Sequence, residues 1–157
     1  MGIVMTRIAL GLAVAALAAT GALAEDLIDA TDPNRIVELA KGFGSANLET
    51  DTDGSPMITG RMDGTRYVVY FYGCDDGKEC DDIQFAASWS DAKVDPKDIN
   101  AWNMNKRFAK AYLDDQGDPV IDLSVNIDYG VTVRNLEDTF DWWSIAMREF
   151  KSQVLKM

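Results

Sequence analysis

The chain has 157 residues, with 15 Lys or Arg, 26 Asp or Glu and no His, so its formal net charge is -11. So acidic a surface repels nucleic-acid phosphates and anionic lipid head groups, which argues against both as partners. The absence of His removes the usual general base and excludes Ser-His-Asp and Cys-His catalytic sites. We therefore predict a non-enzymatic protein with no catalytic residues, metal or cofactor, and keep a carboxylate-based hydrolase as the remaining enzymatic alternative.

The N-terminal segment has the pattern of a cleaved secretory signal peptide. Arg7 precedes an apolar run over residues 8–19, and Ala22-Leu23-Ala24 is a small-residue cleavage signature. A transmembrane anchor would need a longer apolar run. We expect cleavage after Ala24, which leaves residues 25–157 as one domain in the periplasm or outside the cell, with no further membrane contact. Loss of Arg7 changes the charge to 14 − 26 = −12.

Capping and turn residues predict the first elements of the mature chain. Asp32 is placed to cap a short helix that has Pro33 at its first position. Residues 47–50 and 57–62 then flank a turn rich in Asp and Gly, as the two strands of a hairpin do.

Four further segments have the composition of strands. Residues 67–72 form an unbroken β-branched and aromatic run, which is typical of a central strand buried on both faces. Residues 83–89 alternate apolar and polar side chains, so they predict the next strand. Two more strands are expected at 108–113 and 120–127, and the second has the clearest alternation in the chain.

Two more helices complete the prediction. Asp95 caps the second, which we expect to unwind before Phe108, and the third begins near Asn135. Its apolar stripe recurs at spacings of three and four and comprises Leu136, Phe140, Trp143, Met147, Phe150 and Val154. Hairpin-length turns favour antiparallel pairing, so we predict an α+β fold with an antiparallel sheet of about five to six strands and three helices.

Cys74 and Cys80 lie on either side of a short acidic loop between the two central strands. Opposed hairpin positions bring β-carbons to roughly 4.5–5.5 Å, which is close to disulfide distance. A redox dithiol is disfavoured by the acidic neighbours, and structural zinc requires four Cys or His ligands. We therefore predict a disulfide that stabilises the fold by about 2 kcal/mol in the chain-entropy model, consistent with an oxidising compartment.

Several aromatic and polar residues are candidates for a binding surface. Trp102 is either a core residue or part of a recognition surface, and its neighbour Asn103 is either a hydrogen-bonded helix residue or part of the same surface. Trp142 falls on the flank of the terminal helix, where an exposed aromatic side chain is typical of an interface. The candidate surface comprises Trp102, Asn103, Arg107, Tyr70, Tyr72 and Trp142.

Separate motifs along the chain resemble the YbjN-domain family. They are residues 67–71, Cys74, Cys80, and residues 83–85, 100–103, 107–108, 111–114 and 117–120. Members of this family are labelled bacterial sensory transduction regulators. The resemblance implies a two-layer α+β fold similar to type III secretion chaperones, which are small, acidic and commonly dimeric. The signal peptide and the Cys pair depart from cytoplasmic relatives, so a cytoplasmic secretion-chaperone role is not expected.

Two functions of different classes follow. The first is an exported interaction or regulatory module that binds a polypeptide partner or forms a homodimer. The alternative is a periplasmic calcium or small-ligand binding protein, because the turns at residues 51–54 and 114–118 offer clustered oxygen atoms. Neither turn completes an EF-hand pattern, and Asp and Gly are also ordinary turn residues.

Overall fold

The computed structural model describes residues 26–157, and the expected signal peptide and its cleavage site lie outside them. A six-stranded antiparallel sheet has the order β2-β3-β4-β5-β7-β6. Its strands are β2 (Ser45–Thr50), β3 (Pro56–Met62), β4 (Thr65–Tyr72), β5 (Asp82–Ser88), β6 (Lys110–Leu113) and β7 (Pro119–Asn126). The helices are α1 (Pro33–Lys41), α2 (Pro96–Asn105) and α3 (Val133–Gln153). The predicted α+β class is therefore confirmed.

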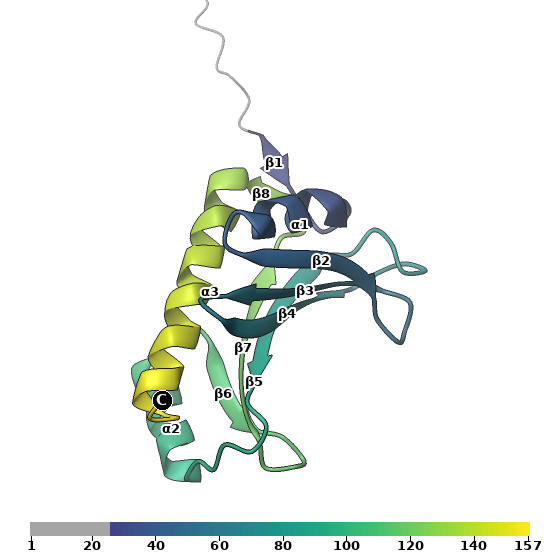
Figure 1. Cartoon of the computed structure of the whole chain (residues 1–157). Helices are drawn as coiled ribbons and strands as arrows, with labels where there is room; N and C mark the ends of the chain where they lie inside the picture. Colours follow the sequence, from purple (N-terminus) through teal and green to yellow (C-terminus); the bar gives the residue numbers. More distant parts are fainter. Residues whose placement is uncertain (1–25) are drawn as a thin grey trace, which may run out of the picture.

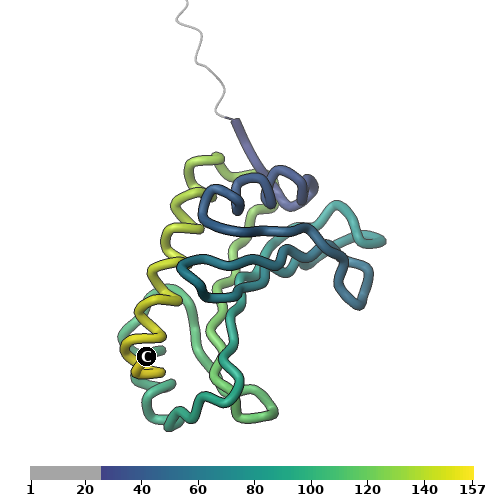
Figure 2. Tube along the Cα trace, viewed as in Figure 1, coloured from purple at the N-terminus to yellow at the C-terminus, as the bar shows by residue number. Residues whose placement is uncertain are grey.

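The helices are arranged around a strongly twisted sheet (Figure 1). The long helix α3 runs along one side, with α1 beside the edge strand β2 and α2 beside the edge strand β6. The first described residues lie near the start of α3 and the C-terminus lies near its end (Figure 2). None of the helices within residues 26–157 combines the length and the apolar character that a bilayer span requires.

Both predicted aspartate caps are confirmed. The Asp32 carboxylate accepts a hydrogen bond from the backbone N–H of Arg35 at the start of α1, and Asp95 accepts one from Lys97 at the start of α2. These bonds satisfy donors that the first turn of a helix leaves free. Helix α2 ends at Asn105, so the predicted unwinding before Phe108 is also confirmed.

The core is formed between α3 and the inner face of the sheet. All members of the predicted α3 stripe are buried, and their positions match the expected spacing. Phe85 of β5 meets Phe140 edge to face with ring centroids 4.9 Å apart, and Trp143 lies 5.6 Å from the same ring. The aromatic side chains of α3 therefore hold the helix against the centre of the sheet.

The prediction that β4 is buried on both faces is wrong. Tyr67, Val69 and Phe71 point into the core, but the alternate residues Val68 and Tyr70 are only half-buried and Tyr72 is 46% exposed. The helices pack against one face of the sheet and leave the other open (Figure 1). A run of β-branched and aromatic residues does not record which of the two faces is covered.

Strand β6 is shorter than predicted, because it begins at Lys110 instead of residue 108. Ala109 adopts a left-handed conformation with φ 56°, which ends the extended chain before it. Phe108 consequently leaves the sheet and its ring packs against Trp142 of α3.

A two-stranded ribbon was not predicted. The strands β1 (Leu27–Ile28) and β8 (Val131–Thr132) pair antiparallel, and the Val133 N–H donates to the carbonyl of Asp26 at 3.2 Å. Arg35 of α1 reinforces this end through a 2.7 Å ion pair with Asp26. Strands of two residues show no alternation, so pattern analysis cannot detect them.

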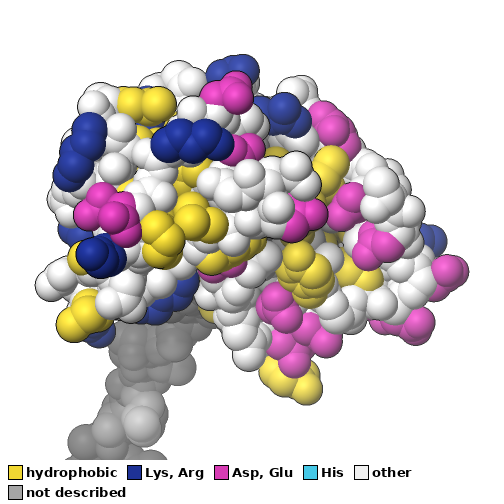
Figure 3. All heavy atoms as spheres, turned by 90° about the horizontal axis from the view of Figure 1, so that it is seen from below, with side chains coloured by type: hydrophobic (Ala, Val, Ile, Leu, Met, Phe, Trp, Pro, Cys, Tyr) yellow, Lys and Arg dark blue, Asp and Glu magenta, His cyan; other side chains and the backbone are white. Residues whose placement is uncertain are grey.

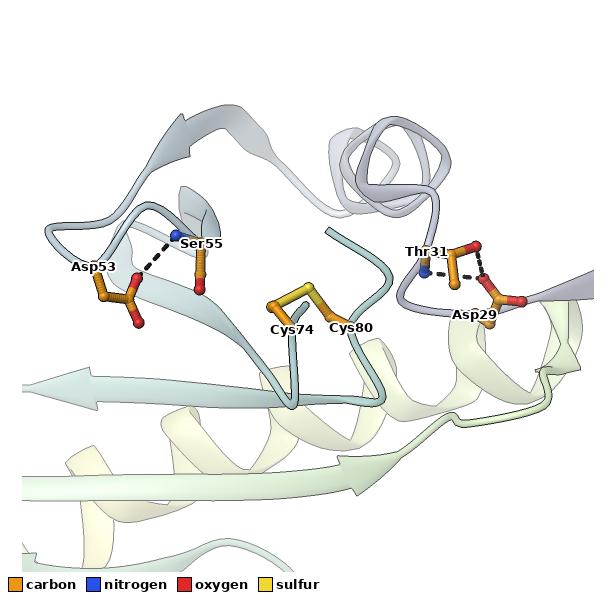
Figure 4. The surroundings of a disulfide bond; sticks show 6 residues. All are labelled: Asp29, Thr31, Asp53, Ser55, Cys74 and Cys80. Carbon is orange, nitrogen blue, oxygen red and sulfur yellow. Dashed lines mark hydrogen bonds between the residues drawn. A yellow bond between two sulfur atoms is a disulfide. The ribbon is translucent and has the colours of Figure 1, made fainter. Parts of the chain in front are cut away.

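The predicted disulfide is present between Cys74 and Cys80, and it joins the two arms of the β4–β5 loop (Figure 4). The loop also packs against the neighbouring β2–β3 turn. A β-carbon added to Gly77 would lie 2.6 Å from the carbonyl oxygen of Gly54, and the φ of Gly77 is 71°. Glycine is therefore required at this contact for both space and conformation.

Candidate functional site

The candidate residues separate into two places. Trp102, Arg107 and Trp142 line one groove between the end of α2 and helix α3, whereas Tyr70 and Tyr72 lie on the open face of the sheet. We call the first place the aromatic groove. Its volume is about 290 Å³, and its lining residues are Trp102, Asn105, Lys106, Arg107, Phe108, Trp142, Ile145, Ala146 and Glu149.

Trp102 is a core residue that only borders the aromatic groove. Its side chain is 4% exposed, and its indole N–H donates to the carbonyl of Ala109 at 2.7 Å. Its ring also meets Phe150 edge to face, with centroids 5.1 Å apart. Of the two interpretations that the sequence allowed, the structure therefore supports the core role.

Asn103 also has a structural role. Its amide donates to the carbonyl of Ala111 at 2.9 Å, and its side-chain oxygen accepts from the Ala111 N–H at 2.8 Å. The side chain therefore pairs with the outer edge of β6 as a neighbouring strand would. Asn103 is absent from the groove lining, so the structure does not bring it together with Trp142.

Trp142 and Phe108 form the exposed aromatic part of the groove. Each is 45% exposed, and their ring centroids lie 5.3 Å apart. The indole N–H of Trp142 donates to Asp138 one turn earlier in α3, at 3.2 Å, which fixes the orientation of the ring. Phe108 was missed as a site residue because the sequence analysis placed it in a strand. The predicted end of α2 just before Phe108 was the signal that could have placed it at the helix end instead.

Cations border the groove in an otherwise acidic chain. Lys106 forms a 2.7 Å ion pair with Glu149, and its ammonium nitrogen lies 5.1 Å from the ring centroid of Trp102. The guanidinium carbon of Arg107 lies 5.5 Å from the ring centroid of Phe108. Among residues 26–157 no carboxylate forms an ion pair with Arg107. The groove therefore combines apolar surface with one uncompensated cation.

The second place is a hollow on the open face of the sheet, which we call the tyrosine trough. Its volume is about 640 Å³. It is lined by Arg66, Tyr67, Val68, Tyr70, Tyr72, Gln84, Ala86, Ala87, Ser88, Ser90, Tyr112, Asp114 and Val120. Figure 3, seen from below, shows hydrophobic side chains in the hollowed middle of this side of the molecule and many acidic ones towards the right. Tyr112 is a further lining tyrosine that the sequence analysis did not select.

The polar groups of the trough are partly withdrawn from water. The Tyr72 hydroxyl donates to Gln84 at 3.4 Å, and the Gln84 amide donates to Ser124 at 3.1 Å. Burial raises the pKa of the Asp122 carboxyl, which lies beside Ala86 on the same face. Burial is also the largest cause of the raised pKa of Tyr72 and of Tyr112.

The acidic turns that suggested calcium use their carboxylates to hold the backbone. Asp53 accepts from the N–H of Ser55 at 2.8 Å (Figure 4). Asp114 accepts from the N–H groups of Gln116 and Asp118, both at 2.9 Å. Within residues 26–157 no three Asp, Glu, Cys or His side chains are arranged to hold a metal ion. These contacts are the ordinary hydrogen bonds of Asx turns.

Comparison with known proteins identifies the family. A family model named YbjN, described as "putative bacterial sensory transduction regulator", matches residues 32–156. Neither a search of curated proteins nor one of solved structures returns a match, so the likeness to type III secretion chaperones stays a prediction. The matched region extends from the cap of α1 to beyond the end of α3. The chain therefore belongs to the YbjN family.

Proposed function

We propose that the chain is an exported regulatory or interaction module that binds a polypeptide partner in the aromatic groove. The observation that carries this proposal is the contact between Phe108 and Trp142, two half-exposed aromatic side chains held 5.3 Å apart over an apolar groove. Large aromatic side chains held in this way are typical of residues that dominate binding energy at interfaces. The family description, a sensory transduction regulator, is compatible with such a role.

The dimensions of the groove favour one anchoring side chain. Sites for small ligands usually have volumes of about 300–1,000 Å³ and enclose most of the ligand. At about 290 Å³ the aromatic groove is just below that range, and its side chains Phe108 and Trp142 are half-exposed. One apolar side chain of a partner would fill it, while the rest of the partner lies across α2 and α3.

The charges at the rim favour an acidic group next to that anchor. Arg107 has no carboxylate partner within the described chain, and its guanidinium is held beside Phe108. A partner carboxylate there would gain a charge-assisted hydrogen bond. The proposed partner segment therefore carries an apolar side chain followed or preceded by Asp or Glu.

Export is supported by the N-terminal signal pattern and by the disulfide. Disulfides persist in oxidising compartments such as the periplasm, and both cysteines of the chain form one here. The proposal assigns no catalytic step to the chain, in agreement with its lack of His and with the regulatory description of the family.

The proposal is tested by crosslinking from inside the groove. A benzophenone amino acid is placed at Phe108, or at the 91% exposed Tyr129 as a control, in the chain that begins at Glu25. After irradiation in an envelope extract, a polypeptide linked from Phe108 and not from Tyr129 is identified and purified. We expect its Kd to rise at least about tenfold with Trp142→Ala and to stay unchanged with Tyr129→Ala.

Each other outcome has a definite meaning. If the crosslinked polypeptide is a second copy of the chain, sedimentation should show a dimer that Trp142→Ala dissociates, and the module binds itself. Equal affinity of Trp142→Ala and the native chain for the purified partner would overturn the proposal.

A further inference from the structure

We infer that the tyrosine trough is a separate binding site for an aliphatic amine that carries two or more ammonium groups. It lies on the open face of the sheet, whereas the aromatic groove lies between helices, so this inference does not depend on the proposed function. The trough has a volume of about 640 Å³, within the range of about 300–1,000 Å³ that is usual for small-molecule sites.

The shape of the trough follows from the side chains on the open face. Its floor consists of small residues, because Ala86 and Ser88 of β5 face Val68 of β4 and Val120 of β7. Its walls are tyrosines: Tyr70 and Tyr72 on β4, with ring centroids 6.4 Å apart, and Tyr112 on β6. A small-residue floor between aromatic walls leaves room for an elongated aliphatic chain.

The walls approach one another although their strands are not neighbours. Strands β4 and β6 are separated by β5 and β7, yet Tyr72 of β4 and Tyr112 of β6 line the same hollow. The twisted sheet therefore curls and brings the two sets of rings towards each other. Tyrosine rings facing a common space attract ammonium groups through their π faces.

The charges around the trough determine which sign of charge a ligand should carry. Asp51 and Asp82 contribute, after burial, to the raised pKa of Tyr72. Asp122 and Asp114 contribute in the same way to the raised pKa of Tyr112. Two cations lie on the same face. Arg66 lines the trough, but the ammonium group of Lys110 donates to the backbone carbonyls of Asn103 and Lys106 at the end of α2. Asp114 lines the trough, and the strand register places Asp82 opposite Tyr72 and Asp122 opposite Ala86 on the same open face. Three carboxylates on this face therefore outnumber the guanidinium of Arg66.

The hydrogen-bonding groups select the kind of cation. Asp122 is half-buried beside Ala86 of the trough floor, and its carboxylate forms no ion pair with a Lys or Arg side chain within residues 26–157. A primary or secondary ammonium group can donate to such an acceptor, whereas a quaternary ammonium cannot. Carboxylates also lie near two ends of the trough, with Asp82 opposite Tyr72 on β5 and Asp114 after β6. An amine with several charges along a chain matches this distribution better than a monovalent one.

The inference is tested by calorimetric titration of the chain that begins at Glu25, at constant ionic strength. The probes are spermidine, tetramethylammonium, Mg²⁺ and a short peptide with two lysines. We expect spermidine to bind at least about tenfold more tightly than each of the other three. Asp122→Asn and Tyr112→Ala should each weaken spermidine binding by about tenfold or more, with circular dichroism showing that both variants remain folded.

A matched control separates a site from general charge attraction. Glu137→Gln removes the same charge from an exposed position on α3, and spermidine binding should stay within about twofold of the native chain. The inference is overturned if Glu137→Gln weakens binding as much as Asp122→Asn, or if Mg²⁺ binds as tightly as spermidine. Tighter binding of the lysine peptide would also overturn it, because the trough would then be a site for basic polypeptide.

Discussion

Asn103 and Ala111 pair through both ends of one side-chain amide, with an N–H···O distance of 2.9 Å in one direction and 2.8 Å in the other. The first residue belongs to α2 and the second to β6, which is an edge strand of the sheet. The pairing satisfies a backbone donor and acceptor that an edge would leave free, and it fixes α2 against the sheet.

Replacement of this amide should destabilise the fold. Asn103→Ala leaves the partly buried N–H and C=O of Ala111 without protein partners, so we expect the free energy of unfolding to fall by about 1–3 kcal/mol. Urea denaturation followed by circular dichroism measures the change. Asn105→Ala is the control, because its amide bonds only within the exposed surface of α2, and its cost should stay below about 0.5 kcal/mol. Equal costs for both variants would contradict this role of Asn103.

The disulfide should contribute moderately to stability. The double variant Cys74→Ala and Cys80→Ala opens a loop with a sequence separation of 6, and the chain-entropy model gives a loss of about 2 kcal/mol. Dithiothreitol should lower the free energy of unfolding of the native chain, measured by urea denaturation, by a similar amount. It should leave the free energy of unfolding of the double variant unchanged. A native chain that is insensitive to the reductant, with Ellman's reagent confirming two free thiols, would show that the bond adds no stability.

The buried hydroxyl of Tyr67 should make stability depend on alkaline pH. It has no hydrogen-bond partner among residues 26–157, and burial raises the pKa of Tyr67 from 10.0 to about 12. Between these values the unfolded chain loses this proton while the folded chain keeps it, so stability falls as pH rises from 10 towards 12. The loss attributable to Tyr67 is up to about 3 kcal/mol.

Tyr67→Phe isolates this contribution from the other tyrosines. At pH 7 the variant should be as stable as the native chain or about 1 kcal/mol more stable, because it removes an unpaired buried polar group. Urea melts at pH 8 and at pH 11 should show a smaller loss for the variant than for the native chain. Identical pH dependence of the two proteins would rule out the assigned shift.

The two tryptophans of the predicted binding surface should respond differently to truncation. Trp102→Ala removes a buried ring and its bond to Ala109, so we expect a loss of about 3–5 kcal/mol in unfolding free energy. Trp142→Ala removes a half-exposed ring and should cost no more than about 1 kcal/mol. Thermal melts of both variants measure the two losses of stability. A larger loss for Trp142→Ala than for Trp102→Ala would contradict the core position of Trp102. Only Trp142 is suitable for binding tests.

The sequence predicted local features well and tertiary contacts poorly. The caps Asp32 and Asp95 and the buried stripe of α3 depend on neighbours within one or two turns, so spacing alone was sufficient. The open face of β4 depends on where the helices pack, and a run of strand-forming residues carries no record of that packing. The same holds for the candidate site, because Phe108 and Trp142 meet across 34 positions of sequence only after α2 and α3 are in place.

The direction of α3 determines how the protein can be attached to a surface. The helix has 21 residues and is about 30 Å long, and the β1–β8 ribbon lies at its beginning. At its other end Gln153 and Val154 lie beside Trp102 and Lys106, which also line the aromatic groove. A tag or solid support fixed to the C-terminus would therefore crowd the groove. Attachment ahead of Asp26 leaves the groove facing the solvent, so affinity columns and biosensor chips for this protein should be coupled through its N-terminal side.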